Sequence, residues 1–513
     1  MLKNVGKCVL VTVLAVCSFA GVGAAPRQAA AFTSSNADSA MNAFVNVFYD
    51  PGAKYFYTNS DHQIHSEHAF GPDGGKYTDF WWEAQLWETV MDAYERTHNS
   101  TYRTMIDEIY TGFNQKYPNM MANDFNDDLG WWALACMRAY ELTGTEEYRN
   151  RASFLFDQIY SFYDNTYGGG IWWKRDGTSP QKNMATNAPM VITAVKLKNA
   201  TGNPAYLTKA QNIYGWIKSR LSSGSKLGDH VEGSGSGTAV DWDFSYNYGT
   251  YMGAALSLYK ETHNAAYLTD ANNSANYVIS KMTLSNTLMY EGENDGAGFK
   301  MIFMRYLNQL RLETGNSSYL TFLQQNATQA YNHRRNSDQI IGSDWTGPTG
   351  SGYVQSLAAA AGASVLQLVP ADGYTGFIAG NGVYEAENAL LTKNGGGGIF
   401  NESSTAGYSG RGYVAGWNTN GTGITFNVNQ NSDSTRTMTI RYAAGAGNAS
   451  RYISVNGSVI APNQVFNATN GWGDWQTLTL NVNLKAGFNT IVIGYDSSKG
   501  NANYLNVDQI YGL

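Results

Sequence analysis

Helical periodicity dominates the first two thirds of the chain. Apolar residues recur at spacings of three and four in runs such as Trp131 to Leu142 and Tyr148 to Tyr160, which predicts α-helices with a buried face. Between such runs a short motif returns, in which a Tyr follows a Thr by five residues. Its five copies begin at Thr97, Thr143, Thr201, Thr262 and Thr314. We expect each copy to end one helix and to begin the next.

The spacing of this motif predicts a closed set of helical hairpins. Successive copies lie 46, 58, 61 and 52 residues apart, which is long enough for one hairpin and a variable loop. Five hairpins, with a sixth formed by segments near residues 36–49 and 353–368, indicate an all-α (α/α)6 toroid. The short Thr-containing turns would lie on one rim, and the long connections, where function usually resides, on the other.

The pattern changes near Ala371. Beyond it, short stretches of alternating apolar and polar residues, such as 423–428 and 437–442, are separated by Gly, Asn and Ser. This pattern predicts an all-β jelly-roll sandwich. We therefore expect a helical domain over residues 32–370, a linker over 371–381 and a β domain over 382–513.

The first residues are typical of a secretory signal. Lys3 and Lys7 precede an apolar run from Cys8 to Val22 and then several alanines, so residues 1–31 are predicted to be a signal peptide. The alternative, a membrane anchor, requires a longer apolar run. The protein is therefore expected to be secreted and extracellular, with no membrane partner.

Composition narrows the class of ligand. Only 15% of the residues are charged, the net charge is −7, and the chain has 35 Tyr and 13 Trp. The negative charge argues against a nucleic-acid partner. Sugars are neutral and stack on aromatic rings, so a polysaccharide partner fits this composition. We expect the protein to act as a monomer.

Two adjacent acids, Asp127 and Asp128, stand immediately before an apolar, helix-like run. At a loop-to-helix junction the backbone can direct both carboxylates into one pocket, which suits general acid and base chemistry. Capping of the helix is the plain alternative, since acids favour helix N-termini. A calcium loop beginning at Asp124 is another, but Leu129 and Ala135 stand where such a loop needs Gly and an acid.

Other polar and aromatic groups occupy the long connections of the same predicted rim. The candidates for sugar binding are Trp82, Asp124, Asn126, Trp173, Asn183, Asn187, Tyr246 and Asn247. His62, His65 and His68 have a spacing that could bind a metal ion, although they stand in a loop-like polar stretch, and their role stays open.

Several motifs of the helical part resemble glycoside hydrolase family 76, the endo-α-1,6-mannanases. They are the Asp pair before Gly130-Trp131-Trp132, the Gly169-Gly170-Ile171-Trp172-Trp173 segment, Lys182-Asn183 with Asn187, the turn from Tyr246 to Gly249, and Gly298-Phe299-Lys300. The resemblance covers residues from about 34 to 370 and implies an (α/α)6 fold. Tyr248 departs from the family, where Gln is common, which puts that local substrate contact in doubt.

The C-terminal part resembles carbohydrate-binding modules of family 6 or 35, through Tyr384-Glu385-Ala386-Glu387, Gly412-Tyr413-Val414, Gly471-Trp472-Gly473 and Leu505-Asn506-Val507-Asp508. The resemblance implies a structural calcium ion held by Glu385, Glu387 and Asp508. It also implies a glycan contacted by Tyr413, Trp472 and Asn506. From the sequence alone, the two glutamates would be exposed strand acids.

The family resemblance implies endo-acting hydrolysis of α-1,6-mannosidic bonds in mannan with retention of configuration. Such a reaction needs a nucleophile, here Asp127, and a general acid/base, here Asp128. No cofactor is expected for catalysis. Two alternatives stay open: another toroidal glycosidase or transglycosylase that acts on a different glycan, and a glycan-binding protein without catalytic activity.

Overall fold

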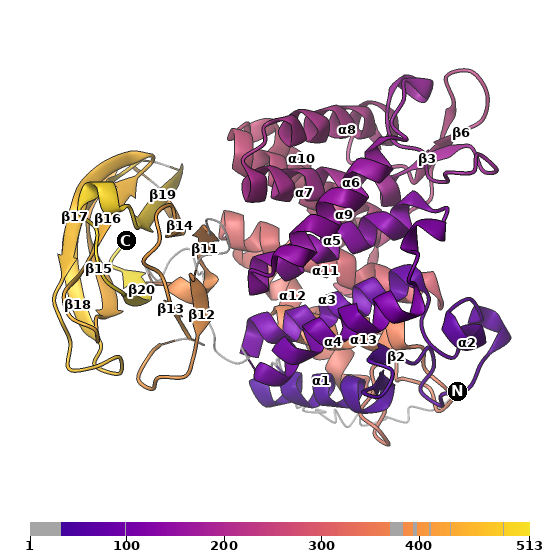
Figure 1. The fold of residues 1–513 in the computed structure, drawn as a ribbon, viewed down its shortest axis with the longest axis horizontal. Coiled ribbons are helices and arrows are strands. Elements are labelled where there is room, and N and C mark those ends of the chain that lie inside the picture. Colours follow the sequence, from indigo (N-terminus) through magenta and orange to yellow (C-terminus); the bar gives the residue numbers. More distant parts are fainter. Residues whose placement is uncertain are drawn as a thin grey trace, which may run out of the picture. The chain divides into compact units, whose positions relative to one another are not determined.

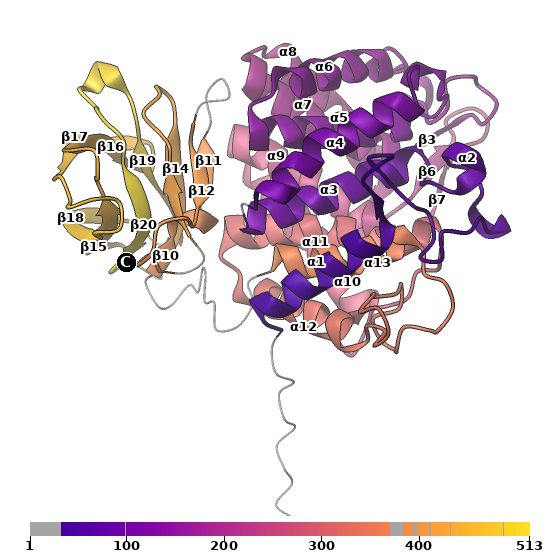
Figure 2. The same ribbon diagram turned by 60° about the horizontal axis from the view of Figure 1, so that its bottom comes forward.

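The computed structural model describes residues 32–97, 99–369, 383–392, 398–409, 412–430, 432–485 and 487–513. The predicted signal peptide and linker lie outside these residues. The described part of the chain forms a helical domain and a β domain (Figures 1 and 2), each with a hydrophobic core of its own residues.

In the described part of the helical domain, six helices pack side by side, each against the next and the last against the first. These inner helices form a closed ring and are α3 (Phe80–Thr97), α5 (Asn126–Thr143), α7 (Met184–Thr201), α9 (Ser245–Thr262), α11 (Asp295–Thr314) and α13 (Ser356–Leu368). An outer helix packs on each of them: α4 (Ser100–Lys116), α6 (Glu146–Tyr160), α8 (Ala205–Leu221), α10 (Ala265–Lys281), α12 (Ser317–Asn332) and, on α13, α1 (Ser34–Phe48). The predicted toroid is confirmed, including the hairpin made by segments far apart in the sequence.

Burial distinguishes the inner helices from the outer ones. Helix α7 is buried over most of its length, whereas α10 buries only Ala271, Ser274, Ala275 and Val278, which share one face. Close packing within the ring depends on glycine at one contact. A Cβ added to Gly249 of α9 would lie 2.7 Å from the Cα of Phe303 of α11. Because the inner helices are buried on nearly all sides, they need apolar residues around their whole circumference.

The repeated Thr residues end the inner helices, as predicted. Each Thr hydroxyl donates to the carbonyl four residues earlier, at 2.7–2.8 Å, and accepts the N–H two residues later. These turns join the C-terminal ends of the inner helices to the outer helices. The N-terminal ends of the inner helices therefore share the opposite rim, with the longer connections.

Short elements decorate these connections. They are the helices η1 (Ser66–His68), α2 (Pro72–Gly75), η2 (Met120–Ala122) and η3 (Thr166–Gly168), and the strands β1 (Tyr49–Asp50), β2 (Tyr55–Phe56), β3 (Gln181–Asn183), β4 (Ser222–Ser223), β5 (Lys226–Leu227), β6 (His230–Glu232), β7 (Thr238–Val240), β8 (Thr283–Leu284) and β9 (Thr287–Leu288). Strands β3, β6 and β7 form a small antiparallel sheet. Its first strand leads directly into α7.

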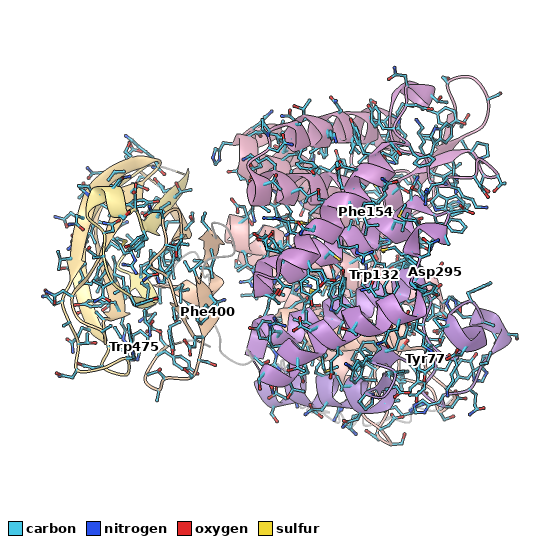
Figure 3. All side chains as sticks on the ribbon, in the orientation of Figure 1. Tyr77, Trp132, Phe154, Asp295, Phe400 and Trp475 are labelled. Carbon is cyan, nitrogen blue, oxygen red and sulfur yellow. The ribbon has the colours of Figure 1, made fainter. Side chains whose placement is uncertain are left out.

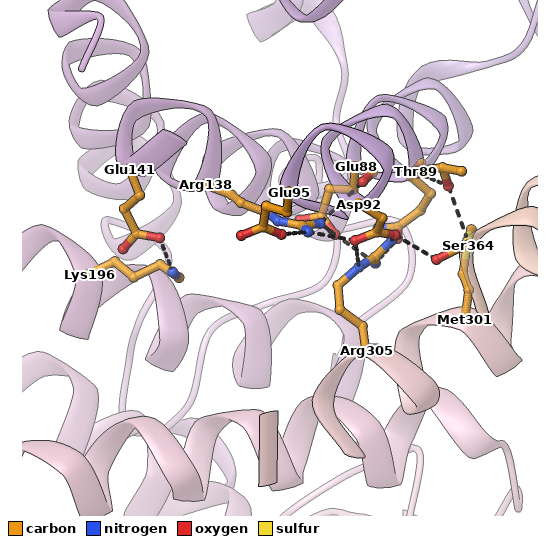
Figure 4. A network of polar contacts seen from close by, with 11 residues as sticks. Glu88, Thr89, Asp92, Glu95, Arg138, Glu141, Lys196, Met301, Arg305 and Ser364 are labelled. Atoms are coloured by element: carbon orange, nitrogen blue, oxygen red, sulfur yellow. Dashed lines mark hydrogen bonds and ion pairs between the residues drawn. The ribbon is translucent and has the colours of Figure 1, made fainter. Parts of the chain in front are cut away.

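Ion pairs join inner helices to one another toward their C-terminal ends. The pairs are Arg138–Asp92, Arg305–Asp92, Lys196–Glu141, Lys198–Glu261 and Lys260–Glu313. Figure 4 shows the part of this network that surrounds Asp92. The end of the ring that carries the Thr turns is therefore held by paired charges.

The described part of the β domain is a sandwich of two antiparallel sheets. One has the order β12-β13-β20-β15-β18 with β10 also on β20, and the other β11-β14-β19-β16-β17. The strands are β10 (Val383–Glu385), β11 (Leu390–Thr392), β12 (Phe400–Glu402), β13 (Tyr413–Ala415), β14 (Gly423–Gln430), β15 (Ser434–Ala443), β16 (Ala449–Val455), β17 (Ser458–Phe466), β18 (Gln476–Leu484), β19 (Gly487–Gly494) and β20 (Asn506–Tyr511); η4 (Ala386–Asn388) and η5 (Ser497–Lys499) are short helices. Alternate residues face the core, for example Met438, Ile440 and Tyr442. The predicted all-β sandwich is confirmed. Among the residues that the structure describes, no helix is long and apolar enough to span a membrane.

Candidate active site

Asp127 and Asp128 lie in the first turn of α5, on the rim formed by the N-terminal ends of the inner helices. The N-cap position is Phe125, which makes no side-chain capping bond, so neither acid is the N-cap residue. Hydrogen bonds from two backbone N–H groups to other residues fix the start of the helix. The Phe125 N–H donates to Asn123 Oδ1 at 2.8 Å, and the Asn126 N–H donates to the carbonyl of Trp173 at 2.8 Å. A capping role alone therefore does not account for the two acids.

The two acids differ in what stabilises their charged forms. Burial raises the pKa of Asp127, while hydrogen bonding from the Trp173 side chain and from backbone N–H groups of the helix start lowers it. Burial raises the pKa of Asp128 further, and the neighbouring charges of Asp127 and Asp79 add to this effect. The Asn123 amide, which donates to Asp128 Oδ2 at 2.7 Å, opposes it only in part. Asp127 is thus the acid that ionises first, and Asp128 is the one that keeps its proton.

Two further acids face this pair from other parts of the rim. Asp79 directly precedes α3, and its charge raises the pKa of Asp128; Asp295 is the first residue of α11, and its charge raises the pKa of both Asp127 and Asp128. Asp295 is exposed and accepts a hydrogen bond from Trp82 Nε1 at 2.9 Å. Figure 3 places Asp295 on the side of the helical domain where α2, β3 and β6 also lie. Neither acid was among the residues predicted for the site.

An open pocket of about 740 Å³ lies beside Trp173, whose side chain bonds Asp127. Its lining comes from the loop before β3 and from β6, and consists of Trp173, Thr178, Ser179, Pro180, Gln181, Glu232 and Gly233. The pocket combines an indole with hydroxyl, amide and carboxylate groups, and Trp173 links it to Asp127. Such a lining suits a polar ring with one apolar face.

Most of the predicted sugar-binding residues are buried against protein partners. Asn187 bonds both backbone groups of Ile171, and Asn126 Nδ2 donates to the carbonyl of Trp172. The other four residues also bond protein groups. Asn183 caps α7, Tyr246 and Asn247 donate to Asp229, and Trp82 donates to Asp295. All six are at most 6% exposed. These partners position the six side chains, and their contact with sugar stays a prediction.

Two of the predicted sugar-binding residues keep an accessible surface. Trp173 is half-buried and lines the pocket. Asp124 is exposed, and its carbonyl accepts from the Arg175 N–H at 2.8 Å. The calcium-loop interpretation fails because the side chains of Asn126 and Asp128 turn to Trp172 and Asn123 instead of a common centre.

The three histidines do not converge on a metal site. His62 stacks on Tyr57 with ring centroids 3.9 Å apart, and His65 stacks on Tyr353 at 3.6 Å. His68 is 4% exposed and stacks on Trp82 at 3.8 Å, with its Nε2 3.3 Å from Asp79 Oδ2. His68 therefore packs beside Trp82 and Asp79, close to the acid pair.

In the β domain the predicted ligand residues differ in exposure. Tyr413 and Asn506 are 1% and 6% exposed, so neither offers a surface on which a sugar could stack. The Tyr413 ring packs edge-on against Trp475, which is half-buried. Trp472 is half-buried beside Gly445. Tyr504, in the loop before β20, is 44% exposed.

The predicted calcium ligands of the β domain are engaged with protein groups. Asp508 is ion-paired with Arg441 and accepts from the Ser409 N–H at 2.9 Å, while the Ser409 hydroxyl donates to Glu385 Oε2 at 2.8 Å. The described residues contain no group of three or more His, Cys, Asp or Glu side chains that could hold a metal ion. As arranged, Glu385, Glu387 and Asp508 therefore do not fit a shared calcium ion.

Comparison with known proteins agrees with the geometry of the acid pair. The family model for glycosyl hydrolase family 76 matches residues 34–372. The chain belongs to this family. A second model, carbohydrate binding module (family 35), matches residues 382–511. The pair of domains inferred from the sequence patterns thus corresponds to a family 76 domain followed by a family 35 module.

Proteins named mannan endo-1,6-alpha-mannosidase are similar to about half of this chain. The Saccharomyces cerevisiae protein named mannan endo-1,6-alpha-mannosidase DCW1 is 27% identical over 318 residues, which cover 55% of this chain and 68% of the relative. The Eremothecium gossypii protein of the same name is 27% identical over 282 residues, 47% of this chain and 60% of that protein. An isomaltosyltransferase from Sporosarcina globispora is 36% identical over 115 residues, which cover 22% of this chain but only 10% of that protein.

Solved structures show the same fold. The GH76A alpha-1,6-mannanase from Salegentibacter sp. HEL1_6 has a TM-score of 0.60 and 28% identity, and the match covers 65% of this chain and 98% of that chain. An inactive variant of that enzyme, with two consecutive aspartates replaced by asparagine, was solved in complex with alpha-1,6-mannotriose. Its TM-score is 0.60 at 27% identity, and the match covers 65% of this chain and 98% of that chain.

Proposed function

We propose that this protein is a secreted endo-acting glycoside hydrolase that cleaves α-1,6-mannosidic linkages in mannan with retention of configuration. The observation that carries the proposal is the pair Asp127 and Asp128, side by side in the first turn of α5 with unequal stabilisation of their charges. The Salegentibacter relative, which is named an alpha-1,6-mannanase and is inactive without two consecutive aspartates, supports the choice of substrate.

Asp127 acts as the nucleophile. Its ionised form is favoured over that of Asp128 by Trp173 and the helix N–H groups, and no described residue donates a hydrogen bond to its Oδ1. The carboxylate attacks the anomeric carbon, and the bond from that carbon to the leaving oxygen breaks. The product of this step is a mannosyl ester of Asp127, which requires the two carboxyl groups to stand about 5–5.5 Å apart.

Asp128 acts as the general acid and then as the general base. Because its pKa is raised by burial and by the charges of Asp127 and Asp79, it holds the proton that passes to the leaving oxygen. In the second step Asp128 takes a proton from water, the resulting hydroxyl attacks the anomeric carbon, and the ester bond to Asp127 breaks. Two inversions leave the α configuration unchanged.

The C-terminal module is proposed to bind polysaccharide and so to hold the enzyme near its substrate. Trp472 is the predicted contact with an accessible indole, since Tyr413 and Asn506 are buried. In the proposed organisation, residues 1–31 are a signal peptide, 32–370 the helical catalytic domain, 371–381 a linker and 382–513 the β-sandwich module. Retardation of the module in mannan, xylan or β-glucan gels, and its loss in Trp472→Ala, tests this part.

The deciding experiment is hydrolysis of debranched, linear α-1,6-mannan followed by sizing of the products and NMR of the first anomer released. Wild-type protein is expected to give a ladder of α-configured oligosaccharides. Asp127→Asn and Asp128→Asn are each expected to lower kcat by about 10²- to 10⁴-fold or more with an unchanged circular dichroism spectrum. Near-normal cleavage by both variants would contradict the proposed roles.

A further inference from the structure

We propose that Asp295 is a third functional acid on the rim that carries Asp127 and Asp128, where it binds hydroxyl groups of the sugar at the scissile bond. This inference rests on the proposed function and adds a residue on a different inner helix. It starts from the accessibility of Asp295. Its side chain is exposed, yet surrounding protein desolvates the carboxylate enough to raise its pKa. A carboxylate can be accessible to solvent and still be partly desolvated when it lies on a concave surface.

The backbone immediately before Asp295 is strained. Asn294 has φ 54° and ψ −129°, a left-handed conformation that residues with a side chain rarely adopt. Gln355 holds this conformation through two hydrogen bonds of 2.7 Å, one from the Asn294 N–H to Gln355 Oε1 and one from Gln355 Nε2 to Asn294 Oδ1. Strain of this kind costs about 1–3 kcal/mol and persists where the surroundings fix it. The start of α11 is thus held in one position.

The side chain of Asp295 is held as firmly as its backbone. Trp82 Nε1 donates to Asp295 Oδ1 at 2.9 Å, and the Trp82 indole, which is fully buried, is stacked on the His68 ring. Bonding from Trp81 also lowers the pKa of Asp295 and so favours its charged form. An acceptor that is fixed and accessible at once suits a ligand with several hydroxyl donors, as a pyranose has.

Asp295 shares its surroundings with the catalytic pair. Its charge raises the pKa of Asp127, of Asp128 and of Tyr246, which belong to α5 and α9. The charged and titratable groups that face Asp295 are therefore Asp79 and His68 from the α3 side, the two catalytic acids from α5, and Tyr246 from α9. A sugar that reaches Asp127 must lie within the field of Asp295.

The test compares Asp295→Asn with wild type and with Glu146→Gln, a control that also removes a charge from the first turn of a helix, α6, whose exposed acid pairs with Arg149. Asparagine keeps an acceptor for Trp82 but removes the charge. We expect kcat/KM on α-1,6-mannotetraose to fall about 10- to 100-fold. Both limbs of the pH profile should move to lower pH, because loss of a neighbouring negative charge lowers the pKa of both catalytic acids.

A separate measurement distinguishes this proposal from the proposed function. Calorimetric binding of α-1,6-mannotetraose to Asp127→Asn, with and without Asp295→Asn, needs no turnover and should show at least a tenfold loss of affinity. Equal affinity, or cleavage and a pH profile equal to wild type, would overturn the role of Asp295 while leaving the mannanase activity standing. If Asp295→Asn fails to fold by circular dichroism, Trp82→Phe decides, since it keeps the stack on His68 and removes the N–H donor. An unchanged kcat/KM in Trp82→Phe would then overturn the proposal.

Discussion

Asp92 is expected to be a main support of the helical ring. Its side chain is fully buried and accepts from Arg138 Nη2 at 2.5 Å, Arg305 Nη2 at 3.0 Å and the Ser364 hydroxyl at 2.5 Å (Figure 4). Burial alone would raise its pKa, but the charges of the two arginines outweigh this and hold the pKa below its ordinary value. Asp92 thus joins α3 to α5, α11 and α13.

The perturbation is Asp92→Asn, which keeps the size of the side chain and removes its charge. Arg305 is 4% exposed, and within the described part of the chain it then keeps Glu88, at 2.6 Å, as its one ionised partner. Breaking a buried ion pair costs about 3–5 kcal/mol, because the remaining charge is left desolvated. Glu95→Gln is the matched control, since Glu95 contacts the same Arg138 but is 48% exposed. Exposed pairs contribute at most about 1 kcal/mol.

Scanning calorimetry of the full chain measures the effect on the transition of the helical domain. Asp92→Asn should lower its Tm clearly more than Glu95→Gln. Because the folded pKa of Asp92 is depressed, its contribution is present above the unfolded value of about 3.9 and is lost as the pH falls through the folded pKa. The two melting curves should therefore converge in acid. Equal shifts in both variants at pH 7 would refute the reasoning.

Three further predictions follow from the site and the domains. Asp79→Asn should move the alkaline limb of the mannanase pH profile to lower pH, because a neighbouring charge that raises the pKa of Asp128 is lost; an unmoved limb in rate measurements would contradict the electrostatic assignment. A chain that ends near Ala371 should stay folded and cleave soluble α-1,6-mannooligosaccharides, since its core contains only residues of the helical domain; an insoluble or inactive product would show that the β domain completes the fold. Calcium held by Glu385, Glu387 and Asp508 stays a prediction that requires Asp508 to exchange Arg441 for the ion. In that case a chelator lowers the Tm of the β domain, whereas identical melting curves would favour the arginine as the permanent partner.

The fold could be predicted because its signals are local and repeated. Each Thr turn ends a helix through two hydrogen bonds to neighbouring residues, so five copies could be recognised without knowledge of the packing. The acid pair at the start of α5 was equally visible. Both depend on contacts within a few residues, which the sequence displays directly.

The rest of the site depends on contacts between distant segments. Asp295 meets Trp82 only because the ring closes and brings the start of α11 within reach of the start of α3. In the sequence Asn294-Asp295-Gly296 is typical of a turn, although an acid before a helical run is the same signal that identified Asp127. The asparagines predicted to bind sugar show another limit, because the sequence does not reveal their protein partners. Asn183 stands where Asn most often caps a helix, and the structure uses it in that way.

The pKa values of acidic residues are shifted in opposite directions on the two rims of the ring. Toward the C-terminal ends of the inner helices, acids such as Asp92 are paired with cations, and the lowered pKa of Asp92 is a contribution to stability. On the other rim Asp127, Asp128 and Asp295 have raised pKa values, so their partly buried carboxylates lower the stability of the folded state at neutral pH. The positive ends of the helix dipoles favour acids on that rim, yet burial and mutual repulsion outweigh this effect. An arrangement that lowers stability persists where the groups have another task, and transfer of a proton near neutral pH requires such acids.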